Sequence, residues 1–187
     1  MPPYSFQAPA PVIGIVGWKN SGKTTLVVRL VEEFSRRGLH VSTLKHAHHK
    51  LQLDDGATDS ARHRSAGARQ VAVVSSRRWA LITEHEEGDE LDFADVLNKL
   101  DPCDLIIVEG YKSQPIPKIE VRRQGTVTHS HLSVGDSNVI ALVTDENVSE
   151  EPLPHFNSND ISQIADFIYH TLLKAQRNVR IYGDQDI

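Results

Sequence analysis

The sequence predicts an α/β fold in which a mostly parallel β-sheet is flanked by helices. Short apolar runs, typical of strands, alternate with segments whose apolar residues recur at helical spacing. One run, residues 105–108, has four consecutive apolar residues between Asp104 and Glu109, as expected for a strand covered on both faces. A glycine-containing segment joins the first predicted strand to the first predicted helix, which is where α/β proteins commonly bind phosphate.

The predicted elements follow one another in a regular order. The apolar run at 12–16 predicts the first strand, and helical spacing predicts a helix over 23–37 that Gly38 ends. A helix at 90–100 and a short helix ending near Gly67 are also predicted. Asp160 and Gln163 have the spacing of a capping box that opens a last helix. Further strands are predicted at 40–44, 70–75, 79–83, 105–108 and 139–143, with an extra strand or hairpin arm at 116–121.

The chain length of 187 residues suits one domain with appendages. The first eleven residues hold four prolines and predict a flexible lead, 1–11, before a nucleotide-binding domain over 12–175. Residues 176–187 are expected to form a C-terminal tail. A hydrophobic content of 39% excludes bulk disorder.

Composition excludes several functional classes. A net charge of −5 argues against a general nucleic-acid binder, because binding phosphate backbones needs a cationic surface. A single cysteine, Cys103, excludes an internal disulfide and an all-cysteine zinc site. No apolar run approaches the roughly 18 residues of a membrane span, and the lead lacks the positive charge of a signal peptide. We therefore expect a cytoplasmic protein with no membrane or nucleic-acid partner.

The charge is unevenly distributed along the chain. Residues 45–69 carry five Lys/Arg and three Asp, a net +2, together with four of the ten histidines. Residues 84–101 carry eight Asp/Glu and one Lys, a net −7, and the remainder sums to zero. The acidic stretch is interpreted as a solvated helix and loop, whereas the cationic one follows the second predicted strand.

Residues 17–24, GWKNSGKT, match the phosphate-binding pattern GxxxxGK[ST] in its required position between strand and helix. Backbone N–H groups of such a loop surround phosphates, the lysine neutralises them and the hydroxyl after it binds Mg²⁺. Lys23 and Thr24 take these two roles here. The residues predicted to bind nucleotide are Gly17, Trp18, Lys19, Asn20, Ser21, Gly22, Lys23, Thr24 and Thr25.

A second acidic group is needed to hold Mg²⁺ or its water shell. Asp104 and Glu109 flank the strand at 105–108, about 16 Å apart at ~3.3 Å per residue. Ligands of open α/β sheets lie beyond the carboxyl ends of the strands, so Glu109 is predicted to act on Mg²⁺ and Asp104 to begin the strand. Gly110 could offer its N–H to a γ-phosphate.

Base recognition has two candidates. Residues 98–101, Asn-Lys-Leu-Asp, match the N-K-x-D pattern of guanine-specific GTPases, but they close a predicted helix before a strand and are interpreted as a helix terminus. Asp145 and Thr144 end the strand at 139–143, and a carboxylate there could accept from guanine N1–H and N2–H. An ordinary turn residue is an equally good interpretation of Asp145.

Several segments of the sequence, the phosphate loop among them, together resemble one known protein family. The segments GWKNSGKTT, LKHAHH, DDGATDSARHRSAGA, RRWALITE, DLIIVEGYK and PKIEVRR resemble the molybdopterin-guanine dinucleotide biosynthesis adaptor (MobB) family, from about Ile13 to Val143. The resemblance implies a P-loop NTPase fold, binding of GTP with Mg²⁺ and at most slow hydrolysis. It also implies a homodimer formed partly through an added β-hairpin. The implied partner is the guanylyltransferase that attaches GMP to molybdopterin, with molybdopterin a further possible ligand.

The histidine-rich segment leaves alternatives open. His46, His48 and His49 could hold a metal, with Cys103 as a further ligand, or lie over the triphosphate and donate hydrogen bonds, which the resemblance favours. A metal-delivering metallochaperone is therefore the first rival, followed by a small-molecule kinase and an interaction module. Asp54, Asp55 and Asp59 are candidates to orient a water, and Trp79 is a candidate core or interface anchor.

Overall fold

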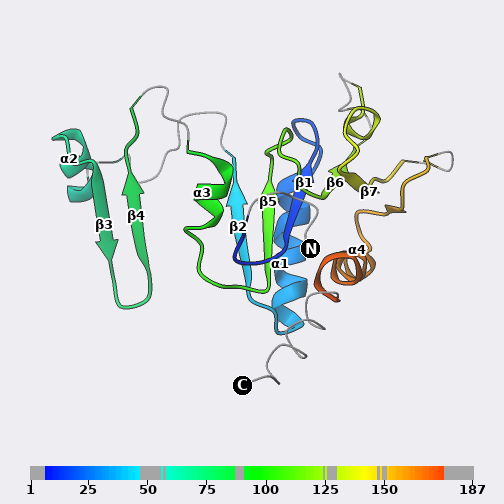
Figure 1. The fold of residues 1–187 in the computed structure, drawn as a ribbon, viewed down its shortest axis with the longest axis horizontal. Helices are drawn as coiled ribbons and strands as arrows, with labels where there is room; N and C mark the ends of the chain where they lie inside the picture. Colours follow the sequence, from blue (N-terminus) through cyan, green and yellow to red (C-terminus); the bar gives the residue numbers. More distant parts are fainter. Residues whose placement is uncertain are drawn as a thin grey trace. The chain divides into compact units, whose positions relative to one another are not determined.

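The structure is a computed structural model that describes residues 7–46, 56, 58–86, 91–123, 125, 130–146, 148 and 151–174. The chain forms two compact units (Figure 1). One, here called the sheet unit, comprises Met1–His46 and Phe93–Ile187. The other, the hairpin unit, comprises Ala47–Asp92. The hairpin unit is thus an insertion in the sequence of the sheet unit.

The sheet unit is built on a six-stranded sheet in the order β2-β5-β1-β6-β7-β8. All five pairs of neighbouring strands are parallel, which confirms the predicted fold class. The carboxyl ends of the strands therefore share one edge of the sheet. The strands are β1 (Val12–Val16), β2 (Val41–Lys45), β5 (Leu105–Glu109), β6 (Lys118–Val121), β7 (Val139–Val143) and β8 (His155–Phe156).

Both faces of this sheet are covered by helices. Alternate strand residues point to opposite sides, so each strand contributes to the core on both faces. Leu105 and Ile107 of β5 join a cluster with α1 (Lys23–Arg36) and α4 (Ile161–Ile168), whereas Ile106 and Val108 join a second cluster with α3 (Phe93–Leu97). The prediction that β5 is covered on both faces is therefore confirmed. The remaining short elements of the unit are a 3₁₀ turn (Leu132–Val134) and a π-helical segment (Tyr169–Leu173).

Strand β6 is an inner strand between β1 and β7, not a hairpin arm. The alternative of an extra strand is therefore confirmed, and its charged residues Lys118 and Glu120 are almost fully buried. Lys118 pairs with Asp136, and Glu120 accepts from Arg122 and from the backbone N–H groups of Leu132 and Ser133. Burial of these charges is tolerated because each one has an opposite charge or several donors beside it.

Two predicted helices differ in detail from the sequence prediction: α3 begins later, whereas α4 begins after Asp160 as predicted but without the predicted cap. Helix α3 comprises only Phe93–Leu97, and residues 87–90 lie outside the described part of the chain. Asp160 occupies the N-cap position of α4, but its side chain makes no capping bond, so the predicted capping box is wrong. The ψ angle of Asp160 is 55°, outside the extended range usual at an N-cap.

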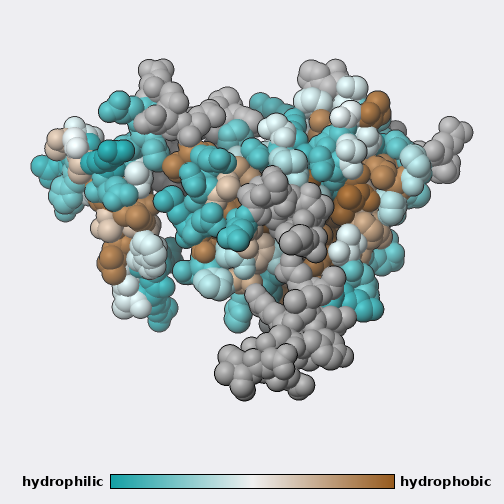
Figure 2. Space-filling view, in the orientation of Figure 1, coloured by the Kyte–Doolittle hydropathy of each residue, from teal (hydrophilic) through white to brown (hydrophobic). Residues whose placement is uncertain are grey.

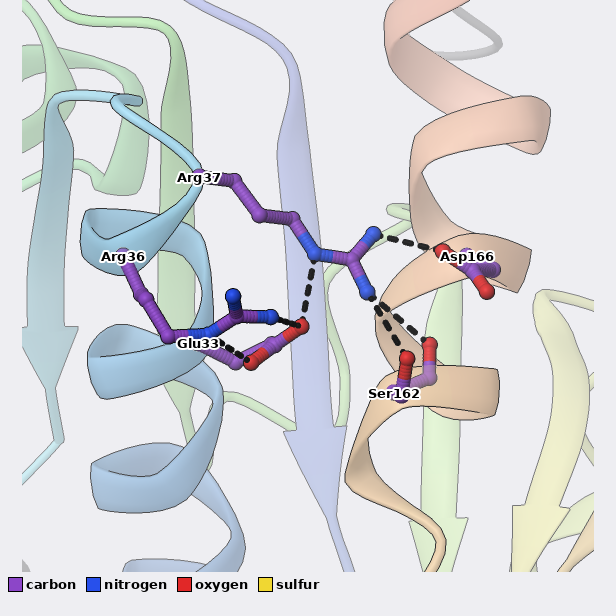
Figure 3. Close-up of polar contacts among 5 residues, drawn as sticks. All are labelled: Glu33, Arg36, Arg37, Ser162 and Asp166. Carbon is purple, nitrogen blue, oxygen red and sulfur yellow. Dashed lines mark hydrogen bonds and ion pairs between the residues drawn. The ribbon is translucent and has the colours of Figure 1, made fainter.

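Helices α1 and α4 are joined by a polar clamp (Figure 3). The Arg37 guanidinium donates to Glu33 of α1 and to Asp166 and Ser162 of α4. Arg36 donates to both carboxylate oxygens of Glu33. These bonds lower the pKa of Glu33 to about 2. The clamp therefore connects the C-terminal end of α1, the helix that follows the phosphate loop, with α4.

The predicted lead 1–11 is packed in its second half. Ala10 is 6% exposed and, with Ala8 beside it, contacts the α3 side of the core. Residues 1–6 and the predicted tail after residue 176 lie outside the described residues. The packed part of the chain therefore begins before Val12. Within the described residues, no helix combines the length and apolar character needed to cross a membrane.

The hairpin unit contains α2 (Asp59–Ser65) and the antiparallel strands β3 (Gln70–Val74) and β4 (Trp79–Thr83). The two predicted strands are confirmed, since Val74 pairs with Trp79 across a short turn. Trp79 is 67% exposed and is not a core residue of this unit. Figure 2 shows hydrophobic side chains on the surface of this hairpin, and the exposed ones are Val73, Val74 and Leu81 together with Trp79.

Candidate functional site at the carboxyl edge of the sheet

The phosphate loop leaves β1 in a tight curve that requires glycine. A Cβ atom on Gly17 would lie 2.5 Å from the Val121 carbonyl oxygen and 2.6 Å from Ser21 Oγ, so no larger residue fits. Asn20 and Gly22 have φ angles of 64° and 98°, in the left-handed region that Asn and Gly tolerate best. The loop is thus held open as a ring of backbone around the start of α1, as the sequence motif predicts.

Ser21 carries a buried polar atom that the protein does not satisfy. The residue is 4% exposed, and its Oγ has no hydrogen-bond partner among the described residues. A buried hydroxyl without a partner costs about 1–3 kcal/mol. A phosphate oxygen in the loop is a suitable acceptor, so this atom fits the ligand that the motif predicts.

The Lys23 side chain is held by a backbone carbonyl of the phosphate loop. Its Nζ donates to the Trp18 carbonyl oxygen at 2.7 Å. The pKa of Lys23 is lowered by burial and by the ammonium groups of Lys112 and Lys45, while Glu109 opposes the shift. An anion would relieve both the desolvation and the repulsion between these cations, so the electrostatics favour a polyphosphate here.

Thr24 and Glu109 lie together as the magnesium prediction requires. The Thr24 hydroxyl donates to Glu109 Oε1 at 2.8 Å, joining the start of α1 to the carboxyl end of β5. Lys45, the last residue of β2, places its ammonium 3.1 Å from the same oxygen. Hydroxyl and carboxylate oxygens are the ligands that Mg²⁺ prefers, so this donor set fits the ion. The Lys45 ammonium already puts one positive charge beside the Glu109 carboxylate, where the ion would bind.

Gly110 does not present a free N–H to the loop. Its N–H donates to the Ile15 carbonyl oxygen at 3.1 Å and extends the ladder between β5 and β1. The predicted contact of this N–H with a γ-phosphate is therefore wrong in this structure. The φ angle of Gly110 is 92°, and a Cβ there would lie 3.3 Å from His46 Cβ. The glycine thus serves a turn and a close approach to His46.

Tyr111 gathers the two chain segments that border the insertion. Its ring centroid lies 4.6 Å from that of His46, which follows β2, and 4.8 Å from that of Phe93, which begins α3. His46 also donates its backbone N–H to the Glu109 carbonyl oxygen at 3.0 Å. His46 is therefore close to the carboxylate proposed for Mg²⁺, as its place after β2 predicts.

A cavity of about 250 Å³ adjoins the helix side of the loop. It brings Asp145, the second residue after β7, together with Thr25 and Arg29 of α1. Asp145 Oδ1 accepts from the Ser158 hydroxyl at 2.7 Å, and Arg29 donates to the Ser158 and Asn159 carbonyl oxygens. The carboxylate predicted for base recognition is thus in a cavity with the loop, fixed in place by its neighbours.

The opposite edge of the sheet carries the residues interpreted as structural. Residues 98–101 follow α3 and precede β5, which confirms that they terminate a helix at the amino edge. Asp104 Oδ2 accepts from the His40 backbone N–H at 2.8 Å and ties the starts of β2 and β5 together, as predicted for a strand-start residue. Neither group lies at the carboxyl ends of the strands.

Other predicted site residues are not brought to the loop. Asp59 lies in the hairpin unit and pairs with Arg62, whereas His48, His49, Asp54 and Asp55 lie outside the described residues. Cys103 precedes β5, about 16 Å of strand from the carboxyl edge where His46 lies, so a site that includes both is wrong. In the described ranges, no three or more His, Cys, Asp or Glu side chains form a metal-binding group.

Three cationic residues near the loop are not identified by the sequence motifs. Lys45 and Lys112 both act on the pKa of Lys23, and Arg29 fixes the loop beside Asp145. Lys45 and Lys112 each stand just beyond a strand or at its end, a position that could have marked them. In the sequence, Arg29 is marked only as one residue of a predicted helix. The residues that it binds, Ser158 and Asn159, lie 129 and 130 positions further along the chain.

A parallel sheet, a glycine-turned loop at the start of a helix and a Thr–Glu pair at the neighbouring strand end define the class of P-loop nucleotide-binding proteins. Comparison with known proteins narrows this class. Residues 12–145 match the family model for molybdopterin guanine dinucleotide synthesis protein B, MobB. The chain belongs to this family.

Named relatives and solved structures agree with the family model. The chain is 39% identical to the molybdopterin-guanine dinucleotide biosynthesis adapter protein of Haemophilus influenzae over 87% of this chain and 89% of that protein. It is 35% identical to the adapter protein of Escherichia coli, over 88% and 94%. A crystal structure of Bacillus subtilis MobB superposes with a TM-score of 0.67, at 25% identity, over 87% of this chain and 98% of that one. These structures share the P-loop NTPase fold seen here.

Proposed function

We propose that this protein is an adapter of molybdopterin guanine dinucleotide biosynthesis that binds GTP with Mg²⁺ and assists the attachment of GMP to molybdopterin. Its relatives from Haemophilus influenzae and Escherichia coli bear that adapter name. The observation that carries the nucleotide part is the Thr24–Glu109 pair beside a loop whose buried Ser21 Oγ has no hydrogen-bond partner in the described part of the chain. The proposed partner is the guanylyltransferase.

Each loop residue has a defined part in binding the triphosphate. The backbone from Gly17 to Thr25 surrounds the phosphates, and Lys23 leaves the Trp18 carbonyl oxygen to neutralise them. Thr24 and Glu109 would hold Mg²⁺, which supplies charge neutralisation for the phosphate oxygens when bound. Glu109 exchanges its contact with the Lys45 ammonium for the ion.

Hydrolysis is proposed to be slow at most. Fast phosphoryl transfer needs an arginine or glutamine placed on the reacting phosphate. In the described part of the chain, the arginines beside the loop are engaged elsewhere: Arg29 binds the 158–159 backbone, and Arg122 binds Glu120 and Glu151. Asp54 and Asp59 are the proposed candidates to orient a water.

The nucleotide proposal is tested by titrating GTP with Mg²⁺ into the Lys23→Ala variant by calorimetry. We expect binding to become undetectable, because the lysine of the motif neutralises the phosphates. Lys99→Ala is the matched control, since Lys99 is exposed beyond α3. Retention of wild-type GTP affinity by Lys23→Ala would contradict the assignment.

Guanine preference is proposed to depend on Asp145. A carboxylate that pairs with guanine N1–H and N2–H has no such partner on adenine, so GTP should bind at least about tenfold more tightly than ATP. Asp145→Ala should remove that difference, and Asp160→Ala, which lacks a capping bond to lose, should retain it. Equal affinity of the unmodified protein for GTP and ATP would exclude guanine specificity.

Self-association is proposed to use the hairpin unit. Val73, Val74, Trp79 and Leu81 expose apolar surface there, and such surface is typical of protein–protein contacts. A homodimer formed through this hairpin would cover it. Sedimentation of the Leu81→Glu variant should show a monomer, and an unchanged dimer would contradict the proposal.

A further inference from the structure

The phosphate loop borders a second cavity, which shares no lining residue with the cavity at Asp145. Its volume is about 370 Å³, within the range of small-molecule sites. Val16 and Trp18 contribute from the end of β1 and the loop, Lys112 from the segment after β5, and Leu132 from the 3₁₀ turn. The cavity therefore adjoins the loop that is proposed to hold the triphosphate.

Lys112 gives this cavity a positive charge. Its Nζ lies 3.8 Å from the centroid of the Trp18 ring, and burial lowers its pKa. The carboxylate that lines the cavity, Asp136, is already paired with Lys118 and accepts from Asn138. Lys112 and Lys45 both lower the pKa of Lys23, whereas Glu109 raises it, so three ammonium groups and one carboxylate interact in this region.

His131 adds a polar atom that lacks a partner. It lines the same cavity, and its Nδ1 is buried with no hydrogen-bond partner within the described ranges. The neighbouring Ser130 carbonyl oxygen accepts from Trp18 Nε1 at 3.1 Å, which holds the indole against this segment. A ligand that bonds to the imidazole would remove the cost of that buried, unsatisfied nitrogen.

We propose that this cavity binds a second ligand beside the nucleotide, a phosphorylated planar heterocycle. Lys112 and His131 bind its phosphate, and Val16, Leu132 and the Trp18 indole pack against its ring. The inference rests on the proposed function, because an adapter for a dinucleotide needs places for two phosphorylated halves. The nucleotide half occupies the loop, and this cavity is the adjoining site with both cationic and apolar walls.

The test uses the full chain with Trp79→Phe, which leaves Trp18 as the single tryptophan of the two in the sequence. With GTP and Mg²⁺ at saturation, 6-hydroxymethylpterin monophosphate is titrated while Trp18 fluorescence is recorded. We expect saturable quenching at one site per chain. Unphosphorylated 6-hydroxymethylpterin should bind at least about tenfold more weakly, because it lacks the group that Lys112 and His131 hold.

Variants separate this site from the nucleotide site. His131→Phe should weaken the pterin phosphate about tenfold while changing GTP affinity less than about threefold. Lys112→Met should weaken the pterin phosphate by a similar factor, and its GTP affinity is not the criterion because Lys112 also acts on Lys23. Lys99→Met is the matched control and should change neither. Circular dichroism of each variant shows whether it folds, and either of the two suffices for the test.

The inference is overturned if the pterin phosphate does not quench Trp18, if it competes with GTP, or if inorganic phosphate binds equally well. It is also overturned if both folded variants bind the probe normally. Each of these results is obtained with GTP binding measured on the same sample. Absence of pterin phosphate binding to the chain that retains Lys112 and His131, with intact GTP binding, contradicts this inference alone, whereas absence of GTP binding contradicts the proposed function.

Discussion

The two ends of strand β5 carry carboxylates with different surroundings. Asp104, before the strand, accepts from the backbone N–H of His40 and so joins two strands at their starts. Glu109, at the strand's last position, accepts from the Thr24 hydroxyl and pairs with the Lys45 ammonium. One carboxylate has a backbone partner, and the other has partners that a metal ion could replace.

The difference shows how position in a parallel sheet separates structural from functional acids. Every strand of this sheet ends at the same edge, so Glu109 meets the start of α1, while Asp104 meets only the beginning of a neighbouring strand. The residue types alone do not distinguish them. The comparison leads to four predictions, which extend from ligand affinity to stability.

The largest effect is expected for Glu109→Ala. The variant loses the carboxylate oxygen that would bind Mg²⁺, so Mg²⁺-dependent GTP affinity should fall at least about tenfold. Calorimetry with and without Mg²⁺ measures this change. Asp104→Ala is the control at the other end of the strand and should bind GTP as the unmodified protein does. A similar loss of affinity in both variants would refute the functional distinction.

Asp104→Ala should instead change stability. It removes the acceptor of the His40 N–H, which is partly solvated, so the free energy of unfolding should fall by about 1 kcal/mol. Urea denaturation monitored by circular dichroism measures the change. A reduction below a few tenths of a kcal/mol would mean that the strand starts do not depend on this bond.

A smaller effect is expected for Lys45→Met, which tests whether the two Glu109 partners compete. Lys45 and Mg²⁺ would use the same carboxylate oxygen, and the lysine side chain is 60% exposed. Exposed pairs contribute about 0.2–1 kcal/mol, so the Mg²⁺ concentration for half-maximal GTP binding should fall roughly twofold. An increased Mg²⁺ requirement would show that Lys45 assists the ion or the nucleotide instead.

The smallest effect at neutral pH concerns a carboxylate at neither end of β5, Glu33 in the clamp of Figure 3. Hydrogen bonds from Arg36 and then Arg37 lower its pKa from 4.5 to about 2. A lowered folded-state pKa stabilises the fold above the unfolded value, and that stabilisation is lost as pH falls from 4.5 towards 2.

Glu33→Gln removes this titration. Urea midpoints of the variant and the unmodified protein should therefore differ most near pH 6 and approach each other as the pH falls through this range. Glu32→Gln, in the same helix turn, is the control and should show no such convergence. A gap independent of pH would contradict the assigned cause of the shift.

Much of the fold could be predicted from local patterns. The strands at 12–16 and 139–143 have the predicted bounds, because an apolar run and a turn signal mark each end. The phosphate loop, Glu109 and Asp104 were also placed correctly. In each of these cases, the motif and the direction of the strand determine which edge a residue occupies.

The remainder depends on contacts between distant segments. The inner position of β6 was not predictable, because Lys118 pairs with Asp136, and Glu120 accepts from the backbone of Leu132 and Ser133 as well as from Arg122; no local pattern connects 132–136 with this strand. The engagement of the Gly110 N–H depends on the pairing of β5 with β1. Lys112 and His131 likewise meet only through the fold, so the cavity that they line has no sequence motif.

The contacts of the Tyr111 ring with two other aromatic rings bear on how the length of the inserted hairpin unit could vary. His46 and Phe93, the last and first residues of the sheet unit around its insertion, both contact that one side chain. The sheet unit itself therefore keeps the two points of departure close together, and closing the loop between them adds little entropic cost as its length changes. The residues that form the parallel sheet and the phosphate loop all belong to the sheet unit, so an insertion of different length between His46 and Phe93 would leave them in place.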